Sequence, residues 1–203
     1  IDPEDENSDL LIMEIYDCLH KIAINFNGAV YSLIGNHEVM NFDNDLRYVS
    51  KRGINDYKNK NLNDRYSEFN KLRKKFACTR NAIIVIGDFI FVHGGLANYL
   101  ISYYKLEDIN KIIRLYIYNK LNTITDKELK KTYNDIVNSS SISPLWYRKL
   151  GLIPPDIINE NNENNENKEY LNNTENICNT IYKPIEDYIN NNTKITNLQG
   201  III

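Results

Sequence analysis

The chain has 203 residues, of which 42% are hydrophobic and 25% charged, and its formal net charge at pH 7 is −3. These values predict a folded protein of one domain or slightly more. They argue against a nucleic-acid partner, because no long basic run is present. They also argue against a membrane segment, because no apolar run approaches about eighteen residues.

The beginning of the chain predicts a helix and then a strand that ends in a polar turn. Apolar residues recur at helical spacing from Ser8 to Phe26, with Ser8 able to cap the start and Gly28 placed to end it. The stretch Ala29 to Ile34 reads as a short buried strand that runs directly into Gly35-Asn36-His37-Glu38. We therefore expect this loop at the carboxyl end of a strand, where open α/β sheets usually bind ligands.

A hairpin is the clearest feature of the middle of the chain. Ala82 to Ile86 and Phe89 to His93 are two apolar runs divided by Gly87-Asp88, a strong local signal for a β-hairpin. Its second strand would deliver His93-Gly94-Gly95 to the end of the sheet. Pro144 to Arg148 forms a compact aromatic segment. Three further segments have helical spacing: Asp64 to Phe76, Leu106 to Leu121 and Asp126 to Val137.

The composition shifts toward asparagine and glutamate between Ile158 and Asn192. We expect a largely disordered insert there, with a modest helix around Tyr182 to Ile189. The last residues, Gly200 to Ile203, read as the first half of a buried strand.

Two of these segments carry residues suited to metal chemistry. Asn36 and His37 stand side by side on a glycine-led turn, and His93 ends a strand and is followed by two glycines. Amide oxygens and imidazoles can bind divalent metals, and Gly94 and Gly95 allow the backbone to approach a ligand closely. The residue types predict a metal site without naming the metal.

The longer motifs carry a family resemblance. The strings L-I-G-N-H-E and, about fifty-five residues later, F-V-H-G-G-L resemble two signature motifs of the calcineurin-like metallophosphoesterases, in the spacing of the phosphoprotein phosphatases. The strings G-N-H-E-V-M-N-F-D-N-D-L-R-Y-V-S and P-L-W-Y-R are similar to the Shewanella-like, bacterial-type protein phosphatases. The resemblance covers Asp9 to Arg148 and implies an α/β fold: a metallophosphoesterase-type β-sandwich flanked by helices, incomplete in this chain.

The resemblance implies roles for four residues. Asn36 would bind the second metal ion and contact the phosphate, His37 would be the general acid, and His93 would be a ligand of the second metal. Arg148 is a weaker candidate for a phosphate contact. The family uses two divalent ions, with manganese, iron or zinc compatible here, and a metal-activated hydroxide that attacks the phosphorus in line.

The chain also departs from the family pattern. It lacks G-D-x-H-G, which supplies an aspartate and a histidine to the first metal in the family, and it lacks a late G-H motif. It also lacks G-D-x-x-D-R-G, which supplies the bridging aspartate, the partner of the acid histidine and a phosphate-binding arginine. We therefore interpret it as a fragment that is inactive alone. Residues 1–157 would be the central part of the catalytic domain, 158–192 the insert, and 193–203 the start of the last core strand. The missing part could hold a targeting segment, so a cytoplasmic location is only slightly favoured.

Three functions remain open at this point. The leading hypothesis is a metal-dependent phosphoprotein phosphatase acting on phosphoserine, phosphothreonine or phosphotyrosine in protein substrates. A small-substrate phosphoesterase, such as a dinucleoside polyphosphate hydrolase, and a non-catalytic phosphatase-like scaffold are the alternatives. Several nearby residues have plainer interpretations: His20, Trp146 and Tyr147 as packing residues, Glu38 as a support of its loop, and Asp43, Asp45 and Arg47 as solvated charges on a helix.

Overall fold

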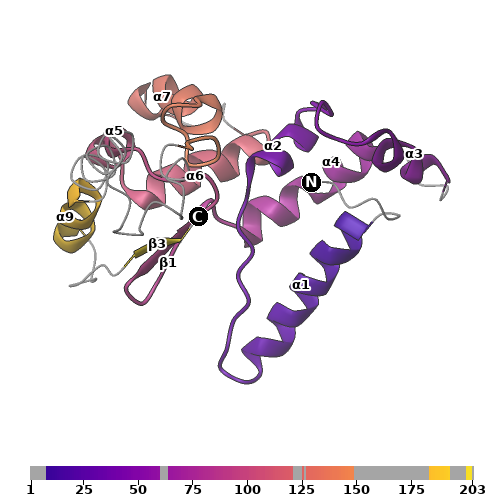
Figure 1. Cartoon of the computed structure of the whole chain (residues 1–203), viewed down its shortest axis with the longest axis horizontal. Helices are drawn as coiled ribbons and strands as arrows, with labels where there is room; N and C mark the ends of the chain where they lie inside the picture. The colour runs from indigo at the N-terminus through magenta and orange to yellow at the C-terminus, as the bar shows by residue number, and fades with distance from the viewer. Residues whose placement is uncertain are drawn as a thin grey trace, which may run out of the picture.

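The computed structural model describes residues 8–59, 64–120, 125, 127–148, 183–192 and 200–202. They form a mixed α/β arrangement in which helices surround one small sheet (Figure 1). The helices are α1 (Ser8–Ile24), α2 (Asn36–Phe42), α3 (Lys51–Asn59), α4 (Arg65–Thr79), α5 (Asn98–Tyr103), α6 (Leu106–Ile117), α7 (Lys127–Asn138) and α9 (Lys183–Asn192). The strands are β1 (Ile83–Ile86), β2 (Phe89–Val92) and β3 (Gly200–Ile202).

The predicted hairpin is confirmed. Strands β1 and β2 pair antiparallel, with Ile83 opposite Val92 and Ile86 opposite Phe89. The connection has two residues, and Gly87 adopts a φ of +57°, a conformation that favours glycine. The hairpin therefore fixes the position of His93, the residue directly after β2.

Strand β3 adds to the hairpin on the side of β2, in parallel register. The strand predicted near the end of the chain is thus confirmed. It is less buried than expected, because Ile202 is exposed at this edge of the sheet and only Ile201 packs partly against the core.

Helix α6 ties the sheet to the helices. Its inward face buries Ile109, Ile112, Ile113 and Ile117. The side chain of Asn110 joins it to the start of β1: the amide oxygen accepts from the N–H groups of Ala82 and Ile83 at 3.0 Å each, and the amide nitrogen donates to the Ile83 carbonyl at 2.8 Å. The Asn110 side chain thus pairs with backbone groups at the start of β1, as a neighbouring strand would.

Helices α2 and α4 pack through aromatic side chains. Phe42 at the end of α2 meets Phe69 and Phe76 of α4 edge-on, at centroid distances of 6.0 and 5.3 Å. Asp64 caps α4 by accepting from the Ser67 N–H at 3.1 Å, which confirms the helix predicted there. The core thus anchors α2, the helix that begins with Asn36 and His37.

One predicted element is wrong. Residues Ala29 to Ile34 were expected to form a buried strand. Among the described residues, this segment instead pairs through a single parallel bridge, between Leu33 and Asn81. Ile34 is buried, while Tyr31 is 57% exposed. In Figure 1 this segment runs back from the far end of α1 toward α2 with no strand beside most of its length. Apolar residues alone could not form a strand there, since a ladder also needs a partner.

The rest of the sequence-based organisation has mixed outcomes. The predicted helix near Tyr182 to Ile189 is confirmed by α9, whereas the remainder of the Asn/Glu-rich segment lies outside the described residues. The α/β class is confirmed. Within the described ranges there is one three-stranded sheet, so the second sheet of the expected sandwich is not present among them. The domain boundaries stay predictions.

Candidate active site

The first turn of α2 presents Asn36 and His37. Gly35 is the residue before the helix, and its N–H donates to the Glu38 carboxylate at 2.8 Å, so Glu38 reaches back over the turn that carries both residues. A Cβ on Gly35 would lie 2.9 Å from this carboxylate and 3.0 Å from the His93 ring. Glycine is therefore required for the close approach of the two loops, and Glu38 supports its loop as expected.

The loop after β2 is held by the segment 144–148. The Gly94 N–H donates to the Pro144 carbonyl at 2.7 Å. A Cβ on Gly94 would lie 2.5 Å from Arg148 Nη1 and 2.7 Å from the Pro144 oxygen, which leaves no room for a side chain. Packing at Gly94 therefore places Arg148 directly beside the histidine loop.

Asn36 and His93 come together across 57 positions of sequence. His93 Nε2 and Asn36 Oδ1 are 2.7 Å apart, with Asn36 only 6% exposed. Two donor atoms that share one metal ion at about 2.1 Å are about 3 Å apart when they subtend a right angle at it. The contact in the structure is a hydrogen bond in which His93 Nε2–H donates to the amide oxygen. Loss of that proton would leave two donor atoms at a spacing that fits one divalent ion.

Electrostatics at His93 favour the neutral imidazole. Burial of the ring lowers its pKa, the nearby charge of Glu38 opposes this, and Arg148 and His37 lower it further. His93 as a whole remains exposed to solvent, so the burial of its ring is only partial. A neutral imidazole is the form that binds a metal ion.

His37 lies half-buried next to Asn36. Its ring stacks on the ring of Tyr48, with centroids 5.7 Å apart and an interplanar angle of 14°. No role was expected for Tyr48 from the sequence. The signal available was its place in the L-R-Y-V-S string, but a distance of eleven positions does not reveal that the two rings meet.

Arg148 is brought to the site without an ion-pair partner in the described part of the chain. Its Nη1 donates to the carbonyls of Leu145 and Tyr147, at 3.3 and 3.2 Å. The side chain is exposed and close enough to His93 to influence its pKa. The four predicted site residues therefore gather at one place, although their individual roles stay predictions.

The surrounding residues mostly have the plainer roles. His20 Nδ1 accepts from the Val30 N–H at 3.2 Å, and Tyr147 is buried in the core. Trp146 is partly buried against the same core. Arg47 forms an exposed pair with Asp45 at 2.6 Å, in the loop after α2 and not on a helix as expected.

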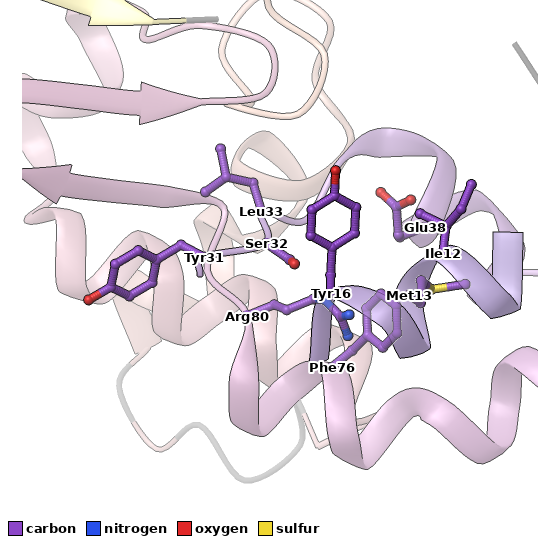
Figure 2. Close-up of a pocket in the computed structure, with 9 residues that line it drawn as sticks. All are labelled: Ile12, Met13, Tyr16, Tyr31, Ser32, Leu33, Glu38, Phe76 and Arg80. Carbon is purple, nitrogen blue, oxygen red and sulfur yellow. The ribbon is translucent and has the colours of Figure 1, made fainter. Parts of the chain in front are cut away.

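A separate cavity of about 310 Å³ lies between α1 and the segment before α2 (Figure 2). Met13 and Tyr16 of α1, Leu33, Phe76 and Arg80 are among its lining residues. The cavity reaches Glu38 but none of the four predicted site residues lines it. This cavity is therefore separate from the candidate site.

The sequence matches one protein family over residues 6–156, the calcineurin-like phosphoesterases. The chain belongs to the calcineurin-like phosphoesterase family. This match includes all four site residues and confirms the resemblance drawn from the two histidine motifs. Members of this family generally use two divalent metal ions. Among the described residues no three His, Cys, Asp or Glu side chains gather as a metal site, and the ligand roles of Asn36 and His93 stay predictions.

Relatives of this phosphoesterase include protein phosphatases. An uncharacterized protein of Acanthamoeba polyphaga mimivirus is 35% identical and is matched over 70% of this chain and 63% of its own length. Shewanella-like protein phosphatase 2 of Arabidopsis thaliana is 28% identical over 54% of this chain and 39% of its own length. The chain thus spans about two fifths to under two thirds of these two relatives.

A solved structure is also similar, namely the cold-active protein-tyrosine phosphatase of a psychrophilic Shewanella species. The identity is 23%, the TM-score is 0.48, and the match covers 78% of this chain and 44% of that one. In the described part of this phosphoesterase, no helix is long and apolar enough to cross a membrane.

Proposed function

We propose that this phosphoesterase is a metal-dependent phosphoprotein phosphatase that hydrolyses phosphate monoesters of serine, threonine or tyrosine. The observation that carries the proposal is the 2.7 Å approach of Asn36 Oδ1 and His93 Nε2 beside His37. Two glycine-bounded loops hold these groups together, and both loops are fixed by packing at Gly35 and Gly94.

Each group in the site has a chemical task. When bound, divalent ions would supply positive charge to the phosphoryl oxygens and lower the pKa of the attacking water. Asn36 and His93 would hold one such ion. His37 lies on the neighbouring position of the same turn, suited to donate a proton to the leaving oxygen. Arg148 offers a cationic fork for the phosphate, because one guanidinium edge is bonded to carbonyls and no carboxylate of the described residues neutralises it.

The choice of a protein substrate rests on the names of relatives. One relative is a Shewanella-like protein phosphatase, and a similar structure is a protein-tyrosine phosphatase. Neither name separates phosphoserine from phosphotyrosine for this chain. A small-substrate phosphoesterase and a scaffold without activity therefore remain as the alternative outcomes of the test.

The test compares two proteins: the 203-residue chain and the full gene product that contains it. Hydrolysis of 4-nitrophenyl phosphate, phosphopeptides and a dinucleoside polyphosphate is measured with manganese and after chelation. His37→Ala and His93→Ala are the test variants. His20→Ala is the matched control, because the third histidine of the chain contacts Val30 and lies outside the site.

We expect manganese-dependent hydrolysis of phosphopeptides by the unchanged protein. Its rate should fall by about a hundredfold or more in both test variants and should be unchanged in the control variant. The His93→Ala variant should also lose manganese affinity in calorimetry. Preference for the dinucleotide would support a small-substrate enzyme. Metal-independent or absent hydrolysis in the gene product would contradict the proposed function.

A further inference from the structure

The ring of His37 has one aromatic neighbour and no ring hydrogen bond among the described residues. The Tyr48 ring lies nearly parallel to the imidazole and strongly offset from it, at an interplanar angle of 14° and a centroid distance of 5.7 Å. An offset stack of this kind is a preferred arrangement for aromatic pairs. Tyr48 is itself 58% exposed, so core packing does not explain its place over the histidine.

The chain returns Tyr48 to the start of α2 by a defined turn. Asn44 adopts a φ of +60° directly after the helix, the left-handed conformation that ends many helices. The Asp45 N–H donates to the Met40 carbonyl at 2.8 Å and the Asn44 N–H to the Asn41 carbonyl at 3.3 Å. These two bonds form a Schellman motif. The turn reverses the chain, so that residue 48 lies back over residue 37.

A second set of contacts holds the loop beyond that turn. Arg47 donates to the Asp45 carboxylate through Nε at 3.0 Å and through Nη2 at 2.6 Å. Its guanidinium carbon lies 5.8 Å from the centroid of the Tyr48 ring. A further bond joins the Val49 N–H to the Leu46 carbonyl at 3.0 Å. Tyr48 is therefore flanked on both sides by residues that form hydrogen bonds, which order the backbone that carries its ring.

We propose that Tyr48 is a positioning residue whose stacked ring fixes the plane of the His37 imidazole for proton donation to the leaving oxygen. This inference rests on the proposed function for its catalytic consequence. The aromatic ring carries the role, since the Tyr48 hydroxyl forms no hydrogen bond with the part of the chain that the structure describes. Orientation of a donor strongly affects rate, because small misplacements in an active site are costly.

The experiment compares Tyr48→Leu, which removes the aromatic face, with Tyr48→Phe, which keeps it. Tyr31→Leu is the matched control. Tyr31 is 57% exposed, and the centroid of its ring lies 6.2 Å from that of another histidine, His20. The values of kcat and KM are measured on a phosphoserine peptide and on 4-nitrophenyl phosphate. The alkoxide of serine needs a proton to leave, whereas 4-nitrophenolate leaves readily without one.

We expect Tyr48→Leu to lower kcat on the phosphoserine peptide roughly tenfold and kcat on 4-nitrophenyl phosphate less than about twofold, with KM little changed. Tyr48→Phe and Tyr31→Leu should both behave as the unchanged enzyme. Equal losses on the two substrates would indicate a structural defect and overturn the inference. Wild-type kcat in Tyr48→Leu, or a Tyr48→Phe variant as damaged as Tyr48→Leu, would overturn it as well.

A measurement on the stack itself separates this inference from the proposed function. Proton–carbon spectra of the three histidine rings, assigned with His37→Ala, should show His37 signals shifted upfield by the Tyr48 ring. The shift should remain in Tyr48→Phe and vanish in Tyr48→Leu. If it is absent from the unchanged protein, the inference is wrong whatever the activity. If the gene product is inactive on both substrates, the proposed function and the catalytic part of the inference fail together, and the spectra still decide the stack.

Discussion

Helices α1 and α6 both carry apolar residues at helical spacing, yet the structure uses the two stripes differently. In α6 the stripe is covered, and Ile109, Ile112, Ile113 and Ile117 are at most 1% exposed. In α1 the corresponding side chains remain at the surface, with Ile15 at 47%. Figure 1 shows α1 extending away from the other helices, whereas α6 lies among them.

Polar contacts hold α1 to the rest of the molecule. Asp9 pairs with Arg65 of α4 at 2.7 Å, and Asp17 contacts Lys75 at 2.5 Å and Arg80 at 3.1 Å. Only Leu10 and Met13 of this helix pack partly against the core. An apolar stripe therefore predicts a helix but not the surface that covers it.

The largest expected difference between the two helices is in the cost of truncating an isoleucine. Ile113→Ala should lower the free energy of unfolding by about 3 to 4 kcal/mol, because it leaves a cavity beside a fully buried site. Ile15→Ala on α1 should change it by less than about 0.5 kcal/mol. Urea unfolding of both variants measures the difference, and equal losses would contradict the contrast between the helices.

A smaller difference is expected between two glycines. Gly94→Ala should destabilise the protein by about 2 kcal/mol, since the new Cβ would press on Arg148, Pro144 and Leu145 at distances of 2.5 to 2.9 Å. Gly28→Ala, after α1, meets its nearest atom at 3.4 Å and should be near neutral. Thermal unfolding compares the two. A Gly94→Ala variant with unchanged stability would show that the loop after β2 can shift to accommodate the added methyl group.

The ionic attachment of α1 can be tested at Asp17. Asp17→Asn should cost about 2 kcal/mol, because it removes the carboxylate beside Arg80, whose side chain is only 3% exposed. Burial lowers the pKa of Arg80, and the charges of Asp17 and then Glu38 oppose that shift. The matched control is Asp45→Asn, which breaks the exposed pair with Arg47 and should produce no resolvable change in urea unfolding. Similar losses in both variants would contradict the ionic role of Asp17.

The smallest effect on stability is expected on the exposed stripe itself. Replacing Ile15 and Leu19 with glutamine should change the free energy of unfolding by less than about 0.5 kcal/mol per site. Binding of a hydrophobic dye to the native protein should fall, because the apolar surface shrinks. Lys21→Gln on the same helix is the control and should leave the dye signal unchanged. Retained dye binding in the double variant would place the accessible apolar surface elsewhere.

The candidate site shows how far the sequence could lead. Asn36, His37 and His93 could be selected because each stands at a glycine-bounded turn and the two motifs have the spacing of a known family. The support of the loop by Glu38 could be expected from its place beside Asn36 and His37, and the Gly35 N–H donates to its carboxylate at 2.8 Å. The stack of Tyr48 on His37 could not, because it depends on the left-handed turn at Asn44. The contact between the two rings could not be predicted, although only eleven positions separate Tyr48 from His37.

The local elements of this phosphoesterase could be predicted from the sequence: the periods of α1, α4 and α6, the two-residue hairpin and the glycines of both histidine loops. These follow from backbone preferences and side-chain periodicity, which act over a few residues. The tertiary structure decided which stripe is buried, why Ala29 to Ile34 forms no strand, and how Asn36 meets His93 at 2.7 Å. Those outcomes depend on partners far along the chain, whose packing no local pattern specifies.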